Sequence, residues 1–95
     1  MHVVIRRYTN AQPLVTAMRE KSTEVEQLIS AVSGFKSYYA IYAGDMATTI
    51  TVCESKAGTD ESMRAAADWV RQNVAAGAVS APEVSEGDTY IHFSA

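Results

Sequence analysis

Two adjacent arginines, Arg6 and Arg7, lie in a segment rich in β-branched residues and are the first side chains whose type and position suggest chemistry. Neighbouring side chains of a strand point to opposite faces, so one of the two guanidinium groups points toward the interior. A buried guanidinium needs an anion or several carbonyl oxygens beside it. The inward arginine therefore either pairs with an internal glutamate or binds the carboxylate or phenolate of a ligand.

His92, Tyr39 and Trp69 are further candidates for a binding or catalytic site. His92 lies within a predicted strand, and imidazole titrates near neutral pH, which suits a general base. A hydrogen-bonded interface histidine is the favoured alternative. Trp69 either lines a ligand pocket or covers the edge of the core, and Tyr39 is expected to point inward. The other histidine, His2, is expected to be solvated at the terminus.

Other kinds of site are not indicated by the sequence. Cys53 is the only cysteine, so no disulfide can form within the chain. We interpret it as a small buried hydrophobe rather than a nucleophile, because no basic residue adjoins it and Glu54 would raise its pKa. No cluster of His, Cys, Asp or Glu has metal-ligand spacing, and no glycine-rich loop resembles a phosphate cradle. We therefore expect neither a metal nor a cofactor.

Length and charge limit the classes of function. A chain of 95 residues is expected to form one domain over residues 1–95, and so small a domain gains stability from a partner that covers apolar surface. Its 8 basic and 11 acidic residues give a net charge of −3, so we expect no binding of nucleic acid. Neither a signal peptide nor a membrane span is predicted, so we expect a cytoplasmic protein without membrane contact.

Hydrophobic periodicity predicts the order strand, helix, strand, strand, helix, strand. Pro13 fits the first turn of the first helix and Gly34 its C-terminal cap. Gly58 is expected in a loop over residues 55–60, with Thr59 or Asp60 capping the second helix. The order is that of a ferredoxin-like α+β domain, with a four-stranded antiparallel sheet and two helices on one face. The predicted strands cover residues 2–8, 35–42, 46–54 and 88–94, and the predicted helices about 10–32, starting at Asn10, and 60–74.

Alternation along the strands sorts the side chains of the sheet into two sets. The set that we expect to face the helices is the more aliphatic one: Val3, Ile5, Phe35, Tyr39, Ile41, Ile50, Val52, Ile91 and Phe93. The opposite set holds most of the tyrosines: Val4, Arg6, Tyr8, Tyr38, Ala40, Tyr42, Thr49, Thr51, Cys53, Tyr90 and His92. A bare sheet face of this composition is typical of an interface, so we expect a homodimer formed through the open face of the sheet.

Short motifs in the same order as the elements resemble the dimeric α+β barrel superfamily, and within it the antibiotic biosynthesis monooxygenase (ABM) branch. Gly34-Phe35 opens the second strand, Cys53-Glu54-Ser55 ends the third, and Glu61-Ser62 leads into the second helix. The resemblance covers essentially the whole chain. It implies a homodimer whose two sheets close into a barrel, with a ligand pocket in each subunit between the sheet and the helices.

The sequence departs from the enzymes of that family at the residues that carry their chemistry. The haem-degrading branch uses a tryptophan at the end of the third strand, where this chain has Cys53, and a histidine late in the second helix, where it has Val70 to Val74. It also uses an asparagine within the first strand, whereas Asn10 lies beyond that strand here. The resemblance therefore does not extend to haem degradation.

The phenol-oxidising branch leaves two hypotheses open. Its enzymes deprotonate a bound phenol, hold the anion and exclude water, and they use Trp, Tyr, Asn and Arg side chains to do so. Here the available side chains match by type only: Arg6 or Arg7, Tyr38 or Tyr39, Trp69 and His92. The first hypothesis is a dimer that binds a small aromatic molecule, as a cofactor-independent monooxygenase or a simple binder. The second is a non-enzymatic ligand-binding or structural dimer.

Overall fold

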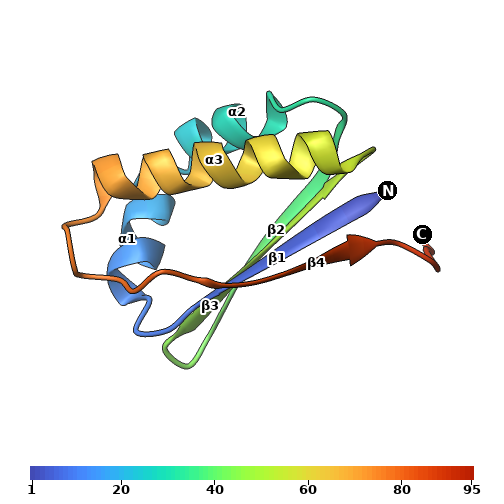
Figure 1. The fold of residues 1–95 in the computed structure, drawn as a ribbon. Helices are drawn as coiled ribbons and strands as arrows, with labels where there is room; N and C mark the ends of the chain where they lie inside the picture. The colour runs from blue at the N-terminus through green and yellow to red at the C-terminus, as the bar shows by residue number, and fades with distance from the viewer.

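The computed structural model describes residues 1–95 and contains one four-stranded antiparallel sheet covered on one face by helices (Figure 1). The strand order is β2-β3-β1-β4, so the two central strands come from the first and third strands of the chain. This topology confirms the predicted ferredoxin-like α+β fold. The elements are β1 (His2–Tyr8), α1 (Gln12–Glu20), α2 (Ser22–Ser30), β2 (Phe35–Ala43), β3 (Met46–Cys53), α3 (Lys56–Asn73) and β4 (Glu83–Asp88).

The predicted first helix is two helices, which is a correction to the continuous helix expected over residues 10–32. Lys21 has φ −118° and ψ 35°, outside helical geometry, and it separates α1 from α2. Each half buries apolar side chains, Leu14 in α1 and Val25 and Ile29 in α2. The break changes the direction of the chain (Figure 1), so both short apolar stripes reach the same core.

The predicted loop over residues 55–60 is also wrong, because α3 already begins at Lys56. Gly58 lies in its first turn, where the helix passes unusually close to neighbouring segments. A Cβ at this position would lie 2.1 Å from the carbonyl oxygen of Ser33 and 2.8 Å from Cβ of Cys53. The glycine therefore permits close approach of helix and strand rather than a turn.

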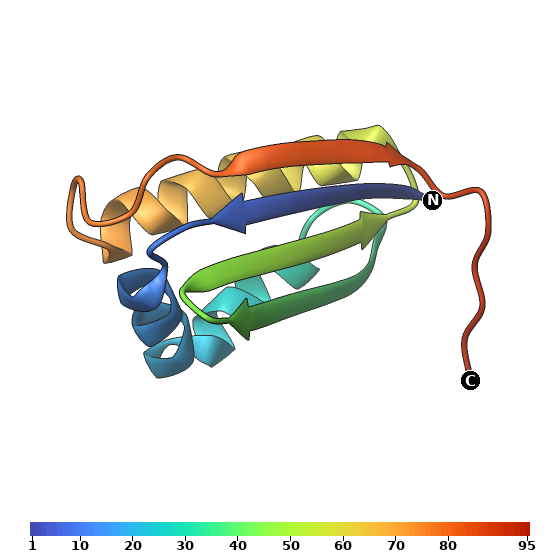
Figure 2. The ribbon, with the colours of Figure 1, turned by 90° about the horizontal axis from the view of Figure 1, so that it is seen from below.

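The last strand lies earlier in the chain than predicted, at Glu83–Asp88 instead of residues 88–94. It pairs with β1 from His2↔Asp88 to Arg7↔Glu83. Its sequence has little strand propensity, but it supplies carboxylates to the edge of β1 and completes the sheet. The alternating segment after it, which includes His92, runs away from the sheet (Figure 2), and Tyr90 and Phe93 are 92% and 90% exposed.

The two faces of the sheet are the reverse of those predicted. In β1 the buried residues are His2, Val4, Arg6 and Tyr8, which lie under the helices, and the residues between them are only partly covered. The same alternation continues in β3, where Ala47, Thr49, Thr51 and Cys53 are buried. Of the set expected to face the helices, only Phe35 packs against their core, and a bulge between Phe35 and Ser37 separates it from the rest of β2. Both faces of this sheet are apolar enough to form a core, so composition alone does not distinguish them.

The face turned away from the helices is therefore the aliphatic one. Figure 2 shows this side of the sheet without a covering helix. Tyr39 is 59% and Ile41 52% exposed on it. We call this surface the open face; its residues are Val3, Ile5, Arg7, Tyr39, Ile41, Thr48, Ile50 and Val52. None of the three helices has the length and apolar character that a membrane span requires.

Candidate ligand pocket around Arg6

Arg6 lies in the middle of β1, between Thr49 of β3 and Val84 of β4, and points under the helices. The residue is 4% exposed. Its Nε and Nη1 atoms are buried without a hydrogen-bond partner, and it takes part in none of the ion pairs of the molecule. A guanidinium stays charged in proteins, so this side chain is a buried cation without an anion beside it. Of the two sequence alternatives, an internal glutamate partner is therefore wrong.

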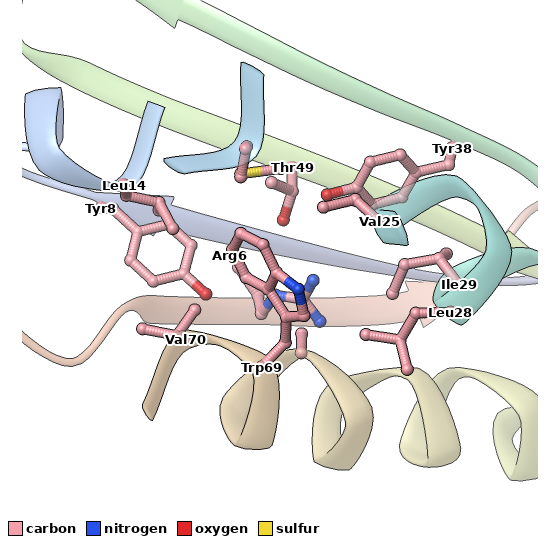
Figure 3. A pocket seen from close by; sticks show the side chains of 12 residues that line it. Arg6, Tyr8, Leu14, Val25, Leu28, Ile29, Tyr38, Thr49, Trp69 and Val70 are labelled. Carbon is pink, nitrogen blue, oxygen red and sulfur yellow. The ribbon is translucent and has the colours of Figure 1, made fainter. Parts of the chain in front are cut away.

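A small cavity adjoins Arg6 between the sheet and the helices (Figure 3). Its volume is about 20 Å³, room for a single water-sized group. No acidic residue lines it, and ten of its twelve lining residues are hydrophobic. The lining consists of Arg6, Tyr8, Leu14, Met18, Val25, Leu28, Ile29, Tyr38, Thr49, Ala66, Trp69 and Val70.

Trp69 of α3 closes the cavity on the helix side. It is 7% exposed, and its Nε1–H donates a hydrogen bond of 2.8 Å to Oε1 of Glu24 in α2. This bond holds the indole ring of Trp69 against α2. The ring therefore forms a rigid wall of the cavity rather than a mobile cover.

Tyr38 of β2 closes the cavity on the opposite side from Tyr8 (Figure 3). Burial raises the pKa of the Tyr38 hydroxyl, and the positive charge of Arg6 opposes that rise. The phenol is thus neutral at physiological pH and can donate or accept a hydrogen bond. Thr49 Oγ1, which also faces the cavity, is buried without a hydrogen bond of normal geometry, and its polar contact with the Tyr38 hydroxyl is weak. The cavity therefore offers a cation and two hydroxyl groups within otherwise apolar walls.

A larger groove adjoins this cavity. It has a volume of about 370 Å³ and lies between α1, α2 and the strands β2 and β3. Met18, Val25, Tyr38 and Thr49 line both spaces, so the cavity and the groove share a wall, and we refer to the two together as the pocket. The groove is lined by Val15, Met18, Arg19, Ser22, Val25, Tyr38, Ala40, Ile41, Tyr42, Ala47 and Thr49.

The structure brings together only part of the residue set expected from the sequence. Arg6 and Trp69 line the same cavity. Arg7 and Tyr39 lie on the open face, so the expected inward orientation of Tyr39 is wrong. His92 follows β4 instead of lying within a strand, and it lines neither the cavity nor the groove.

Several pocket residues were not among the sequence candidates, and Tyr38 was named only as an alternative to Tyr39. Tyr8, Tyr38 and Thr49 were grouped correctly with Arg6 by alternation, but that group was placed on the wrong side of the sheet. The unusual residue in the group was the available signal, because an arginine between Val4 and Tyr8 in a core strand needs a reason to be there. Arg19 gave no such signal, since its position is typical of a solvated helix face.

A second polar cluster lies at the opposite edge of the sheet, where His2 is 8% exposed and not solvated as expected. Its Nδ1 lies 2.9 Å from Asp88 and its Nε2 2.9 Å from Glu86, and Lys56 lies 3.2 Å from the same Glu86 oxygen. The hydrogen bonds that the His2 ring donates to Asp88 and Glu86 raise the pKa of His2 and lower the pKa values of both carboxyl groups. This cluster ties β4 to β1, and none of its residues lines the cavity or the groove.

Comparison with solved structures supports the fold. A mutant of MhuD, in a crystal structure with two manganese protoporphyrin IX molecules bound per active site, has a TM-score of 0.70 and 11% identity over 100% of both chains. NE2512, a protein of unknown function from Nitrosomonas europaea, has a TM-score of 0.69 and 15% identity over 99% of this chain and 93% of its own. Atu4242 from Agrobacterium tumefaciens has a TM-score of 0.54 and 16% identity over 93% and 92% of the two chains.

These similarities support the expected ferredoxin-like α+β fold. No protein-family model matches the chain, and no curated protein matches its sequence. The likeness therefore lies in the fold, and the function has to be argued from the residues of the pocket.

Proposed function

We propose that the chain is a binding protein for a small aromatic acid, whose acidic group pairs with Arg6. The observation that carries the proposal is the buried guanidinium, with Nε and Nη1 lacking partners and no carboxylate beside it. An uncompensated buried charge is strongly destabilising. A sequence that keeps such a charge in a core strand gains most when a ligand supplies the missing anion.

The cavity and the adjoining groove fit the acidic group and the aromatic ring of such a ligand. The cavity of about 20 Å³ accepts one oxygen atom beside Arg6, and the groove of about 370 Å³ falls in the size range of small-molecule sites. The shared wall includes Tyr38 and Val25, which suit an aromatic ring. A planar apolar acid would thus place its carboxylate inside and its ring in the groove.

The fold is compatible with an aromatic ligand, since MhuD binds manganese protoporphyrin IX in its active site. For a haem in particular, the residues of this chain do not fit. His2 lies at the β1–β4 edge and His92 beyond β4, so no histidine lines the pocket to bind an iron.

Binding is better supported than catalysis. A cofactor-independent monooxygenase would need a base to deprotonate its phenol, and no histidine, aspartate or glutamate lines the cavity or the groove. Arg6 can hold a phenolate, and Tyr38 is neutral because burial raises the pKa of its hydroxyl. The pocket thus holds an anion that arrives ionised, and oxygen uptake with a panel of polycyclic phenols tests the enzymatic alternative.

The open face supports a homodimer as the second part of the proposal. Val3, Ile5, Ile50 and Val52 form an aliphatic centre that a soluble monomer rarely leaves bare, with Tyr39 beside it. Two copies packed through this face would form the dimeric barrel that the fold resemblance implies. Apart from Ile41 on the edge strand β2, the residues of the pocket lie on the other face of the sheet or on the helices, so packing through the open face would leave the helix side of each subunit uncovered.

Calorimetry with naphthoic acid and its neutral isostere naphthamide tests the role of Arg6. We expect naphthoic acid to bind and naphthamide to bind at least tenfold more weakly. In Arg6→Met, the acid should lose this advantage while the unliganded protein stays folded and becomes no less stable, because an unpaired buried charge is removed.

Arg64→Met is the matched control, since Arg64 is exposed on α3 and forms no ion pair. If Arg6→Met and Arg64→Met both bind naphthoic acid with the affinity of the wild type, the proposal is overturned. That result would mean that Arg6 does not contact the acidic group. A hundredfold excess of acid over its Kd should raise the melting temperature by about 10 °C in the wild type.

A further inference from the structure

A second unpaired arginine, Arg19, lines the groove that adjoins the cavity of Arg6. Arg19, in the last turn of α1, lines the groove, and its guanidinium carbon lies 5.8 Å from the centroid of the Tyr42 ring. It is exposed and takes part in none of the ion pairs. The ring holds the cation over the mouth of the groove, where it remains free to meet an anion.

The charges of the pocket differ from those of the rest of the chain. The protein has 11 acidic and 8 basic residues, yet cavity and groove together are lined by two arginines and no acidic residue. Arg6 lines the buried cavity and the exposed Arg19 lines the adjoining groove, and the wall that the two spaces share consists of Met18, Val25, Tyr38 and Thr49. A site with a cation at each end and apolar walls complements a molecule with the reverse distribution.

Resting on the proposed function, we infer that the ligand is an elongated aromatic dicarboxylic acid, with one carboxylate at Arg6 and the other at Arg19. The inner carboxylate is desolvated and supplies most of the affinity, because Arg6 is buried and unpaired. The outer one remains in contact with solvent, so its contribution is that of a surface ion pair. Arg19 is then a specificity residue that distinguishes diacids from monoacids of the same shape.

The experiment compares three probes: a naphthalenedicarboxylic acid with its carboxyl groups at opposite ends of the ring system, its monomethyl ester, and naphthoic acid. We expect the diacid to bind the wild type about three- to fivefold more tightly than the monoester at low ionic strength. This advantage should shrink in half-molar salt, because exposed charges are screened. The monoester and naphthoic acid should bind alike.

Arg19→Met should remove the advantage of the diacid and leave naphthoic acid unaffected, whereas Arg6→Met should weaken all three probes. Equal affinity of the diacid and the monoester for the wild type would overturn the inference and leave the proposed function intact. Equal weakening of all probes in Arg19→Met would also overturn it, since Arg19 would then act on the ring. If none of the three probes binds the wild type, the proposed function itself is contradicted.

Discussion

Arg6 and Thr49 occupy directly paired positions on β1 and β3, and both point into the same cavity without hydrogen-bond partners for Arg6 Nε, Arg6 Nη1 and Thr49 Oγ1. Two buried polar side chains without hydrogen bonds on central strands lower the free energy of unfolding of a small domain. Their agreement in place and chemistry supports a site that is completed by a ligand. This view predicts that the free protein gives up stability at these positions.

Thr49→Val tests that cost, because valine has nearly the same shape and removes only the hydroxyl group. We expect the unliganded variant to be more stable than the wild type by about 1 kcal/mol, since an unsatisfied buried hydroxyl is replaced by a methyl group. Urea unfolding measures the change. Thr48→Val, at the neighbouring position on the open face, is the control and should change stability much less. A destabilised Thr49→Val would show that the hydroxyl already has a partner in the free protein.

The contact at Gly58 predicts a strong effect of a single methyl group. In Gly58→Ala the new Cβ would meet the Ser33 carbonyl oxygen at 2.1 Å and Cβ of Cys53 at 2.8 Å, so helix and strand must move apart. We expect a loss of about 2–4 kcal/mol in the free energy of unfolding. Gly87→Ala is the matched control, because nothing lies within 4 Å of its added Cβ. Similar midpoints for both variants in a denaturant titration would contradict the close packing at Gly58.

The cluster around His2 predicts a dependence of stability on pH. Both ring nitrogens lie beside carboxylates, so the imidazolium form is favoured and the pKa of His2 is raised from 6.5. Its contribution is therefore complete below the unfolded pKa and is lost as pH rises through the folded pKa. The pKa values of Glu86 and Asp88 are lowered from 4.5 and 3.8, so their contribution is lost on acidification through their folded values.

Unfolding free energy measured against pH should accordingly be greatest between about pH 4.5 and 6.5, and should fall on the alkaline side of this window as His2 loses its proton. His2→Gln keeps hydrogen-bonding groups but cannot gain a charge. We expect this variant to lose the alkaline-side decrease. His92→Gln, in the exposed segment after β4, should keep the wild-type profile. An unchanged profile in His2→Gln would show that another group causes the decrease.

The sequence predicted the topology well because the spacing of apolar residues and the turn residues Gly34 and Gly44 punctuate it clearly, and both glycines have positive φ. It predicted the wrong side of the sheet for the site. Both faces of β1 and β3 are apolar enough for a core. The charge of Arg6 made the face that is in fact buried look like the exposed one. A buried functional arginine breaks the pattern from which faces are assigned.

The position of β4 was missed for a related reason. Residues 89–93 alternate in hydrophobicity and have high strand propensity, whereas the true strand contains Ser85, Glu86 and Gly87. Pairing with β1 and the two carboxylates at His2 select the polar segment. Long-range pairing of this kind leaves no local periodicity to detect. The same error placed His92 within the sheet.

The open face predicts the assembly state. Ile5 lies at its centre, paired with Ile50 across β1 and β3, and neither is covered within the subunit by a helix. If two copies pack through this face, Ile5→Lys should bury a lysine at the interface and convert dimers into monomers, because an unpaired buried charge opposes association. Sedimentation equilibrium measures the change. Ala67→Lys, which adds the same side chain to the exposed side of α3, should remain dimeric. A wild-type protein that sediments as a monomer at micromolar concentration would contradict the homodimer. It would leave the Arg6 pocket unaffected, because that pocket lies under the helices on the other face of the sheet.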